Sequence, residues 1–504
     1  MRSSSSRFEP IILAGAAVLG LTFWFIVGFP FANHNESYVL SAQLKVMSLA
    51  EVVSHPLFPV ANYRPLGQAV AWLAFRYSGG SLIPVQLFNY VVAAIAWLIV
   101  MFALRERRTF SVVALGVGGF YFAGYIYLFH LQGVFYSPLL LFVSVTFLYF
   151  DRALKPFMHV LIFLGMAVTS LFHPYAVLVY IAATLGYLLE RWRDMKGKDR
   201  LILIVLVALS FGLIEMLVLA PGRQSLLKPQ EMVTGFLTSY RMIELDAPVA
   251  ALSLVLSCMT VLSYPVHPDR RIPLLLATIV SCVVLYLAGV PVIIFWIFLS
   301  GVKMMMLRKW WLAFLIGATA LFPAPAATGS PTYAVFVLMS CSAALAYGWQ
   351  QAEVHLSFLG RRAGVAWICV ILVVSGLVRS DIRVPLISHL ALPLIAEREK
   401  TEQLERIILW VHDSPYRNYN LVLEQNSLNP SVAEDAINRT HRPPTDQEYL
   451  DVYLKSLREP EVAGDSSGKQ LYIAFGQKAT KGGDIIHVEH EKSAGDATVS
   501  LVRG

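Results

Sequence analysis

Long apolar runs separated by short polar connections make up the first three quarters of the chain. A helix needs about 20 mostly apolar residues to cross the hydrocarbon core of a bilayer. The runs therefore predict about thirteen membrane-spanning helices, at residues 10–31, 84–104, 110–129, 134–150, 157–173, 174–189, 201–220, 249–265, 272–289, 291–307, 311–325, 332–349 and 363–379. The predicted fold class is an all-α polytopic membrane bundle.

The pattern changes after about residue 379, where charged residues become common and long apolar runs end. The stretch Leu404–Asp413, LERIILWVHD, has its apolar residues at helical spacing and predicts a helix. Three later stretches, QLYIAF (470–475), DIIHVEH (484–490) and ATVSLV (497–502), are typical of short strands. We therefore expect a transmembrane domain at 1–379 and a small α+β C-terminal domain at 380–504.

Basic residues gather in alternate connections between the apolar runs. Lys and Arg in short loops mark the cytoplasmic side of a membrane protein, and the clusters are Arg2/Arg7, 105–108, 152–155, 191–200, 270–271, 308–309 and 361–362. They agree on one topology, with a cytoplasmic N-terminus and an extracytoplasmic C-terminal tail. The outer connections at 32–83 and 221–248 are then the longest. The first apolar run exceeds the roughly 7–15 residues of a signal-peptide core and no A-x-A site follows it, so we expect a retained span.

Composition supports this interpretation. The 504 residues are 57% hydrophobic and 14% charged, whereas soluble domains average about 45–50% and 25%. The net charge of +7 follows from the basic loop clusters and does not indicate nucleic-acid binding. The four cysteines all lie inside apolar runs without metal-ligand spacing, so we interpret them as small buried hydrophobes.

Polar residues that lipid would exclude are the ones that indicate function in a membrane bundle. They gather on the predicted outer face, beginning with FANHNESY (31–38) directly after the first span. The candidate catalytic residues there are His34, Asn35 and Glu36. The candidate substrate-binding residues are Tyr38, His55, Tyr63, Arg64, His130, His173, Glu215, Arg223, Lys228, Tyr240, Arg241 and Tyr333.

Several candidates have a structural alternative. His130 and His173 lie at helix ends, where a histidine often caps a backbone carbonyl. Glu215 lies within a predicted span, where a carboxylate costs about 2.5–3.5 kcal/mol on insertion scales, and it can serve a substrate or a hydrogen bond in the bundle. Arg64 can snorkel to the headgroups. It also precedes an amphipathic stretch, Leu66–Tyr77, which would hold its guanidinium at the level of a lipid phosphate.

Two segments of the long first outer loop together resemble a known family. The stretch Asn35-Glu36-Ser37-Tyr38 and the later Tyr63-Arg64-Pro65-Leu66 resemble paired motifs of the GT-C superfamily of polytopic glycosyltransferases. The nearest branches are those of the protein O-mannosyltransferases and the lipid A aminoarabinose transferases. The segment Ser330–Gly348, in which Tyr333 begins a span, also resembles a late segment of that family.

The resemblance implies transfer of a sugar from a polyprenyl-phosphate donor to an acceptor on the outer face, with inversion. Glu36 would be the general base, and Asn35 and His34 would orient it. Arg64 and one of Arg223, Lys228 or Arg241 would bind the lipid phosphate, and His55, His130 and His173 would line the sugar or acceptor pocket. No cofactor is certain, although oxygen ligands such as those of Glu36 and Asn35 suit Mg²⁺ or Mn²⁺.

Two departures from the family pattern bear on this hypothesis. Asn35 stands where the family has an Asp, and Pro331-Thr332 precedes Tyr333 where an Arg is common. Two other functions therefore stay open: a transporter or flippase of a lipid-linked saccharide, and a GT-C fold without catalytic activity. The expected location is a bacterial inner membrane, and the expected partners are the lipid donor, membrane lipids and a glycan, lipid or protein acceptor, with no nucleic acid.

Overall fold

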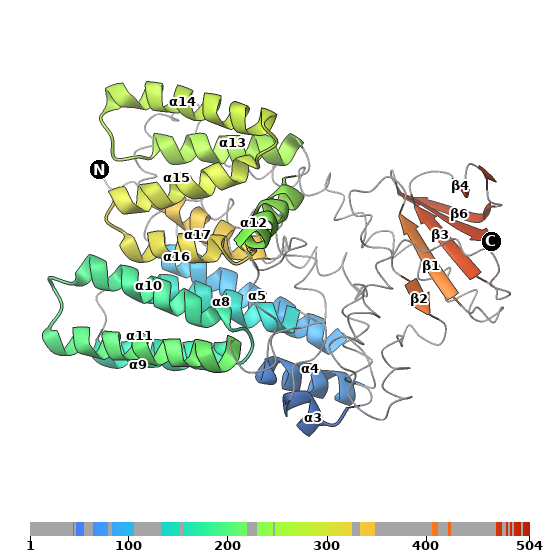
Figure 1. Cartoon of the computed structure of the whole chain (residues 1–504), viewed down its shortest axis with the longest axis horizontal. Helices are drawn as coiled ribbons and strands as arrows, with labels where there is room; N and C mark the ends of the chain where they lie inside the picture. The colour runs from blue at the N-terminus through green and yellow to red at the C-terminus, as the bar shows by residue number, and fades with distance from the viewer. Residues whose placement is uncertain are drawn as a thin grey trace, which may run out of the picture. The chain divides into compact units, whose positions relative to one another are not determined.

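The structure is a computed structural model of the chain, and it describes residues 44, 47–54, 64–78, 83–104, 133–151, 155–218, 229–244, 247–324 and 333–347, together with seven strands after residue 405. These residues form two compact units, which are described separately (Figure 1). Of the described residues, unit 1 holds 91–104 and 136–347. Unit 2 holds those up to Tyr90, residues 133–135 and the strands.

Most helices of the bundle match predicted spans to within a few residues. They are α5 (Ile83–Leu104), α8 (Gly133–Tyr149), α9 (Pro156–Ser170), α10 (Tyr175–Arg191), α11 (Gly197–Val218), α13 (Ala247–Leu262), α14 (Pro268–Leu287), α15 (Val292–Met306), α16 (Trp310–Ala320) and α17 (Ala334–Ala346). Pro156 and Pro268 begin α9 and α14, a position where the missing N–H of proline carries no cost. The predicted spans 10–31, 110–129 and 363–379 lie outside the described residues.

Helix α12 (Pro229–Ile243) of the bundle was not predicted. It lies in the connection 221–248, which was expected to be an outer loop. A search for long apolar runs misses it because Gln230, Thr234 and Arg241 interrupt its hydrophobic residues. In Figure 1, α12 runs at a steep angle to the neighbouring α13, α15 and α16.

The surface of unit 1 has the character of a lipid-facing surface. Among the described residues, α14 is the one helix long and apolar enough by itself to cross a membrane, and α8, α9, α15 and α16 are shorter apolar helices. Ile272 and Val280 of α14 are 69% and 60% exposed, and α9 and α11 expose further Leu, Val and Ile side chains. Apolar faces of this extent would be unfavourable in water, so unit 1 is the bundle of a membrane protein.

Contacts between helix ends agree with the alternating topology expected from the basic clusters. Lys309, at the start of α16, places its Nζ 3.0 Å from Asp151 Oδ1 after α8 and 3.2 Å from Glu190 Oε1 near the end of α10. The Tyr347 ring, after α17, lies 5.8 Å from the same nitrogen. We call this end of the bundle the Lys309 end. The contacts group these helix ends together at one end of the bundle.

Helices α10 and α16 pack closely toward the Lys309 end. A Cβ atom added to Gly186 would lie 2.5 Å from the carbonyl oxygen of Trp310 and 2.5 Å from Trp311 Cα. Only glycine allows the two backbones to approach so closely, as is common where helices associate in membranes. Gly186 therefore fixes the contact point from which the two helices continue toward the opposite end.

Unit 2 contains two short helices and a sheet. In α3 (Leu49–Ser54), Ser48 is the residue before the helix, and its N–H and Oγ both lie 2.7 Å from Glu51 Oε2. The Glu51 N–H donates to Ser48 Oγ, which completes a reciprocal capping box. The amphipathic stretch predicted at Leu66–Tyr77 is helical, as α4 (Pro65–Tyr77), and Trp72 Nε1 donates to the Met47 carbonyl.

The C-terminal strands form a five-stranded sheet in the order β2-β1-β3-β7-β6 and a two-stranded sheet, β4-β5. Their bounds are β1 (Arg406–Val411), β2 (Val422–Glu424), β3 (Gln470–Phe475), β4 (Thr480–Lys481), β5 (Asp484–Ile485), β6 (Val488–Ala494) and β7 (Ala497–Arg503). β1 and β3 are parallel, whereas β3 pairs with β7 and β7 with β6 in antiparallel fashion.

The strand predictions at 470–475 and 497–502 are confirmed, and the stretch 484–490 is divided between β5 and β6. The helix predicted at Leu404–Asp413 is wrong, because Arg406–Val411 is β1. Its run of Ile, Leu, Trp and Val favours a strand, and pairing with β2 and β3 overrides the helical spacing. The domain division at 379/380 stays a prediction.

Candidate functional site

Five of the predicted site residues have side chains that the structure describes: Arg64, His173, Tyr240, Arg241 and Tyr333. Glu215 lies in α11, but its side chain is not among the described ones. Outside the described residues lie His34, Asn35, Glu36, Tyr38, His55, Tyr63, His130, Arg223 and Lys228. The roles proposed for these residues therefore stay predictions.

His173 and Tyr333, far apart in sequence, lie together in a buried aromatic cluster. The ring centroids of His173 and Tyr333 are 5.9 Å apart, and Tyr136 lies 5.2 Å from the former and 5.4 Å from the latter. The hydroxyl oxygens of Tyr136 and Tyr333 are 3.3 Å apart. Because these residues begin α8, α10 and α17, we call this end of the bundle the His173 end.

The local geometry sets the tautomer of His173. The backbone N–H of Tyr175 donates to His173 Nδ1 over 3.2 Å. A neutral imidazole with an accepting Nδ1 carries its proton on Nε2. The ring is fully buried and in this state offers a hydrogen-bond donor, which suits an oxygen atom of a substrate better than the abstraction of a proton.

Tyr240 and Arg241, predicted to bind substrate, make contacts within the bundle. Tyr240 is fully buried and its hydroxyl donates to the Ala320 carbonyl over 2.9 Å. Arg241 Nη2 donates to the Gly289 carbonyl over 2.8 Å, in the turn between α14 and α15. Both contacts fasten the C-terminal part of α12 to other helices at the His173 end.

Glu244, directly after α12, adds a third contact to that end of the helix. Its carboxylate accepts a hydrogen bond of 3.4 Å from the N–H of Ile293, in the first turn of α15. Burial raises the pKa of Glu244 to about 7, and hydrogen bonds to Ser253 and to the amides of Ile293 and Val292 oppose that shift. The sequence-based reasoning did not select Glu244.

In unit 2, Arg64 directly precedes α4 and is 4% exposed. Its guanidinium carbon lies 5.0 Å from the centroid of the Phe135 ring, a cation–π distance. The sequence allowed two positions for this side chain, at lipid headgroups or at a phosphate. The structure buries it, which disfavours simple snorkelling into the headgroup layer.

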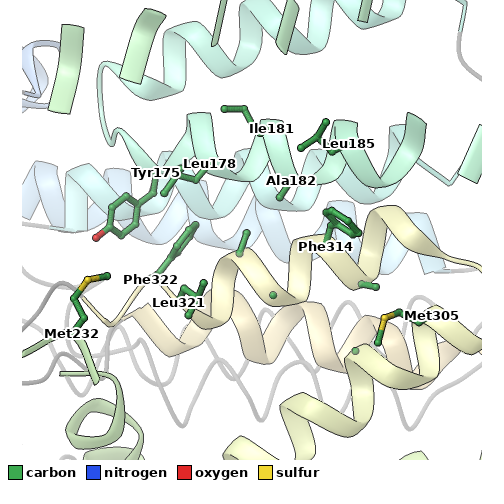
Figure 2. Close-up of a pocket in the computed structure, with 14 residues that line it drawn as sticks. Tyr175, Leu178, Ile181, Ala182, Leu185, Met232, Met305, Phe314, Leu321 and Phe322 are labelled. Atoms are coloured by element: carbon green, nitrogen blue, oxygen red, sulfur yellow. The ribbon is translucent and has the colours of Figure 1, made fainter. Parts of the chain in front are cut away.

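A long apolar groove of about 660 Å³ follows α10 and α16 in unit 1. Ile181 and Leu185 of α10 line it together with Phe314 and Leu321, and Figure 2 shows Met232 of α12 and Met305 of α15 on either side of these residues. Five small residues help to keep the space open: Ala182, Gly301, Ala313, Gly317 and Ala318. The groove is open at the bundle surface, because Leu185, Met305 and Leu321 are each between 38% and 62% exposed.

The groove ends at the aromatic cluster. Tyr175 and Phe322 line it, and Tyr175 lies 4.7 Å from His173 and 5.4 Å from Tyr333, measured between ring centroids. From Tyr175 to Leu185 a helix rises about 15 Å, roughly half of the hydrocarbon thickness of a bilayer. An amphiphile could thus place a chain in the groove and a polar group near the hydroxyls of the cluster.

Sequence-based reasoning missed Tyr136, Tyr175 and Phe322, and it had no means of finding the groove. The available signal was positional, because Tyr and Trp gather where spans meet the membrane interface, and Tyr175 directly follows His173-Pro174. Among the described side chains, no group of three or more His, Cys, Asp or Glu could hold a metal ion. Asn35 and Glu36, the candidate oxygen ligands, lie outside the described residues.

Comparison with known proteins gives one distant likeness. No protein family and no curated protein matches the chain. The crystal structure of ArnT from Cupriavidus metallidurans bound to undecaprenyl phosphate is similar over 98% of both chains, with 12% identity and a TM-score of 0.38. At this identity and TM-score the likeness does not decide the family or the activity of this chain. The proposal below therefore rests on the residues of this chain.

Proposed function

We propose that the chain is a membrane glycosyltransferase that moves a sugar from a polyprenyl-phosphate donor to an acceptor at the extracytoplasmic face. The observation that carries the proposal is the groove along α10 and α16, which ends at the His173–Tyr175–Tyr333 cluster. A groove that is open to lipid, apolar along its length and polar at one end matches a ligand with a long hydrocarbon chain and a polar head.

The proposed roles involve residues that the structure describes and residues outside the described part of the chain. Tyr136, His173 and Tyr333 would donate hydrogen bonds to oxygens of the sugar or phosphate, and α10 and α16 would hold the chain. Glu36 would act as general base for an inverting displacement at the anomeric carbon, oriented by Asn35 and His34. The phosphate leaves with the bonding electron pair, and a guanidinium such as that of Arg64 would stabilise its charge. If a divalent cation takes part, Asn35 and Glu36 would be its ligands.

Filling the groove tests the proposal without disturbing the core. Nothing lies within 4 Å of a Cβ added to Gly317, which lines the groove, or to Gly212 of α11, which does not. Each buried CH₂ contributes about 0.8 kcal/mol, so excluding two or more from the groove should weaken binding about tenfold. We expect Gly317→Leu to lose this affinity for a radiolabelled polyprenyl phosphate, while Gly212→Leu keeps it. Parent-like binding by Gly317→Leu would contradict the groove assignment.

Catalysis needs a separate assay. The variants Glu36→Gln and Arg64→Ala should lose transfer from a labelled polyprenyl-phosphate sugar when compared at equal membrane abundance. Unchanged turnover in both would end the assignment of these residues. If the parent protein binds the lipid but transfers no sugar, the chain would be a non-catalytic member of the fold. Movement of the labelled lipid between leaflets without transfer would identify a flippase.

A further inference from the structure

Helix α12 has a wider apolar face than the bundle buries. Gly235, Ser239 and Tyr240 are buried against other helices, whereas Val233 and Leu237 are 58% and 36% exposed. At 100° per residue, Val233 and Leu237 lie about 20° and 60° around the helix from Tyr240. The exposed apolar surface thus continues the buried face on one side.

Beyond Leu237, the next sector of α12 is polar, at about 80–120° around the helix from Tyr240. Gln230, Thr234 and Arg241 are all exposed and, by the same geometry, fall within a sector of about 40°. The helix therefore has three faces: one packed on protein, one apolar and exposed, and one polar. This is the pattern of a helix that lies in a membrane interface with its polar side toward water.

The position of α12 agrees with that pattern. A helix of 15 residues is about 22 Å long and so shorter than the hydrocarbon core, at about 30 Å. It runs steeply across the directions of α13, α15 and α16 (Figure 1). The hydrogen bonds from Tyr240 to Ala320 and from Arg241 to Gly289 place its C-terminal part at the His173 end of the bundle.

α12 also borders the surface of the bundle that faces lipid. Met232 of α12 and Leu321, just after α16, line the same groove and are 41% and 62% exposed. Figure 2 shows Met232 close to Leu321 and Phe322 at the mouth of the groove. Met232 thus joins α12 to the lipid-facing surface of the bundle at its end, about 80° around the helix from Tyr240 and on the other side of it from Val233 and Leu237.

We propose that α12 lies in the plane of the membrane interface at the His173 end, with Val233 and Leu237 inserted among the acyl chains of that leaflet. Its partner is the lipid surface itself. Gln230 and Thr234 face water or headgroups, and the contacts of Tyr240, Arg241 and Glu244 hold the helix to the bundle. The mouth of the groove then lies at the depth of the lipid headgroups. The inference concerns membrane docking and stands whether or not the chain transfers a sugar.

Spin labels placed on the two faces test the proposal. The full-length protein would carry single cysteines at Val233, Leu237, Gln230 or Thr234, in a background whose native cysteines are replaced, within vesicles of phosphatidylethanolamine and phosphatidylglycerol. Labels at Leu276 of α14, which is 56% exposed, and at Asp194, in an exposed connection, serve as lipid and water references. The readout is collision with oxygen, which enriches in lipid, against collision with a water-soluble nickel chelate.

We expect the labels at Val233 and Leu237 to collide mainly with oxygen, like the one at Leu276, and the label at Thr234, about 100° around the helix from Val233, mainly with nickel, like the one at Asp194. The label at Gln230, about 20° from Leu237, should give an intermediate result. Nickel access at all four positions would overturn the proposal, since α12 would then lie in water. Protection of Val233 and Leu237 from both reagents would also overturn it, because another segment or a second copy of the chain would then cover the face. A background that fails to give a monodisperse protein is replaced by single-cysteine labelling in the parent chain, with the parent signal subtracted.

Discussion

The hydroxyl oxygens of Tyr136 and Tyr333 lie 3.3 Å apart, although the two residues are 197 positions apart in sequence. The contact joins the start of α8 to the start of α17 and places both phenols beside His173. Two hydroxyls in contact share one hydrogen bond between them, so the second proton can point to another acceptor. The pair is therefore a structural tie between the two helices, and in the proposed function its hydroxyls would also donate to a ligand oxygen.

Removing either hydroxyl should affect the ligand more than the fold. A neutral hydrogen bond contributes about 0.5–1.5 kcal/mol, so we expect Tyr333→Phe and Tyr136→Phe each to weaken binding of a polyprenyl-phosphate sugar by about two- to tenfold. The melting temperature in detergent should change little. Tyr286→Phe, at an exposed site on α14, is the matched control and should bind as the parent does. Equal losses in all three variants would argue against a specific role for the pair.

Because α10 and α16 approach closely at Gly186, we expect substitution of this glycine by any larger residue to destabilise the protein. A methyl group there would lie 2.5 Å from backbone atoms of Trp310 and Trp311, and overpacking typically costs about 1–3 kcal/mol. We expect Gly186→Ala to lower the thermal unfolding temperature of the detergent-solubilised protein. Gly212→Ala, where nothing lies within 4 Å, should leave it unchanged or raise it, because alanine favours a helix. A Gly186→Ala variant as stable as Gly212→Ala would show that the two helices can separate without cost.

The sequence could predict the bundle but not the groove, and the physics of each explains why. Spans such as α14 and α15 are local features, since an apolar run must form its own hydrogen bonds in lipid and therefore becomes a helix. Their alternating direction is also local, because it follows from the basic loops. The groove depends on which helices neighbour each other, and nothing in Ala182 or Gly317 alone shows that they line one space. Likewise, the helical spacing of Leu404–Asp413 was outweighed by pairing with strands distant in sequence.

In the candidate site, too, some features could be predicted from local sequence and others depend on how the helices pack. His173 and Tyr333 were selected from the sequence because each is polar or aromatic at the predicted end of a span, and the structure brings them together. Tyr240 was selected because it lies in the predicted outer connection 221–248, yet its hydroxyl donates to the Ala320 carbonyl. Residue type and predicted position identify candidates at the His173 end of the bundle. Only the packing of the helices separates residues that face a ligand from residues that hold helices together.

Glu244 should make the attachment of α12 depend on pH. Its pKa rises from 4.5 to about 7 through burial, so the folded state binds the proton more tightly than the unfolded state does. The sign follows from linkage: this contribution to stability is fully present below pH 4.5 and is lost as the pH rises through 7. It amounts to about 3 kcal/mol at most, at 1.36 kcal/mol for each pKa unit.

We therefore expect less hydrogen–deuterium exchange in α12 at pH 5 than at pH 8, once intrinsic exchange rates are corrected. Glu244→Gln keeps the shape of the side chain but cannot ionise, and it should remove this difference. Asp194→Asn, at an exposed position after α10, is the matched control and should keep the parent behaviour. A pH dependence that survives in Glu244→Gln would assign the effect to another group.

The Lys309 end of the bundle should be sensitive to loss of the cation that Asp151 and Glu190 share. Lys309 Nζ lies 3.0 Å from Asp151 Oδ1 and 3.2 Å from Glu190 Oε1, and the three side chains are only 10–24% exposed. Exposed ion pairs contribute about 0–1 kcal/mol and breaking fully buried ones costs about 3–5 kcal/mol. Since these side chains lie between the two cases, we expect Lys309→Met to cost about 1–3 kcal/mol, mostly through repulsion between the two carboxylates that remain.

A double-mutant cycle separates this repulsion from simple loss of packing. Asp151→Asn removes one carboxylate, so in the Lys309→Met background it should recover part of the lost stability rather than add to the loss. Lys309→Arg keeps the charge and should remain close to the parent in thermal unfolding. If the effects of Lys309→Met and Asp151→Asn were additive, the three helix ends would be held by their apolar contacts and the ion pairs would contribute no coupling.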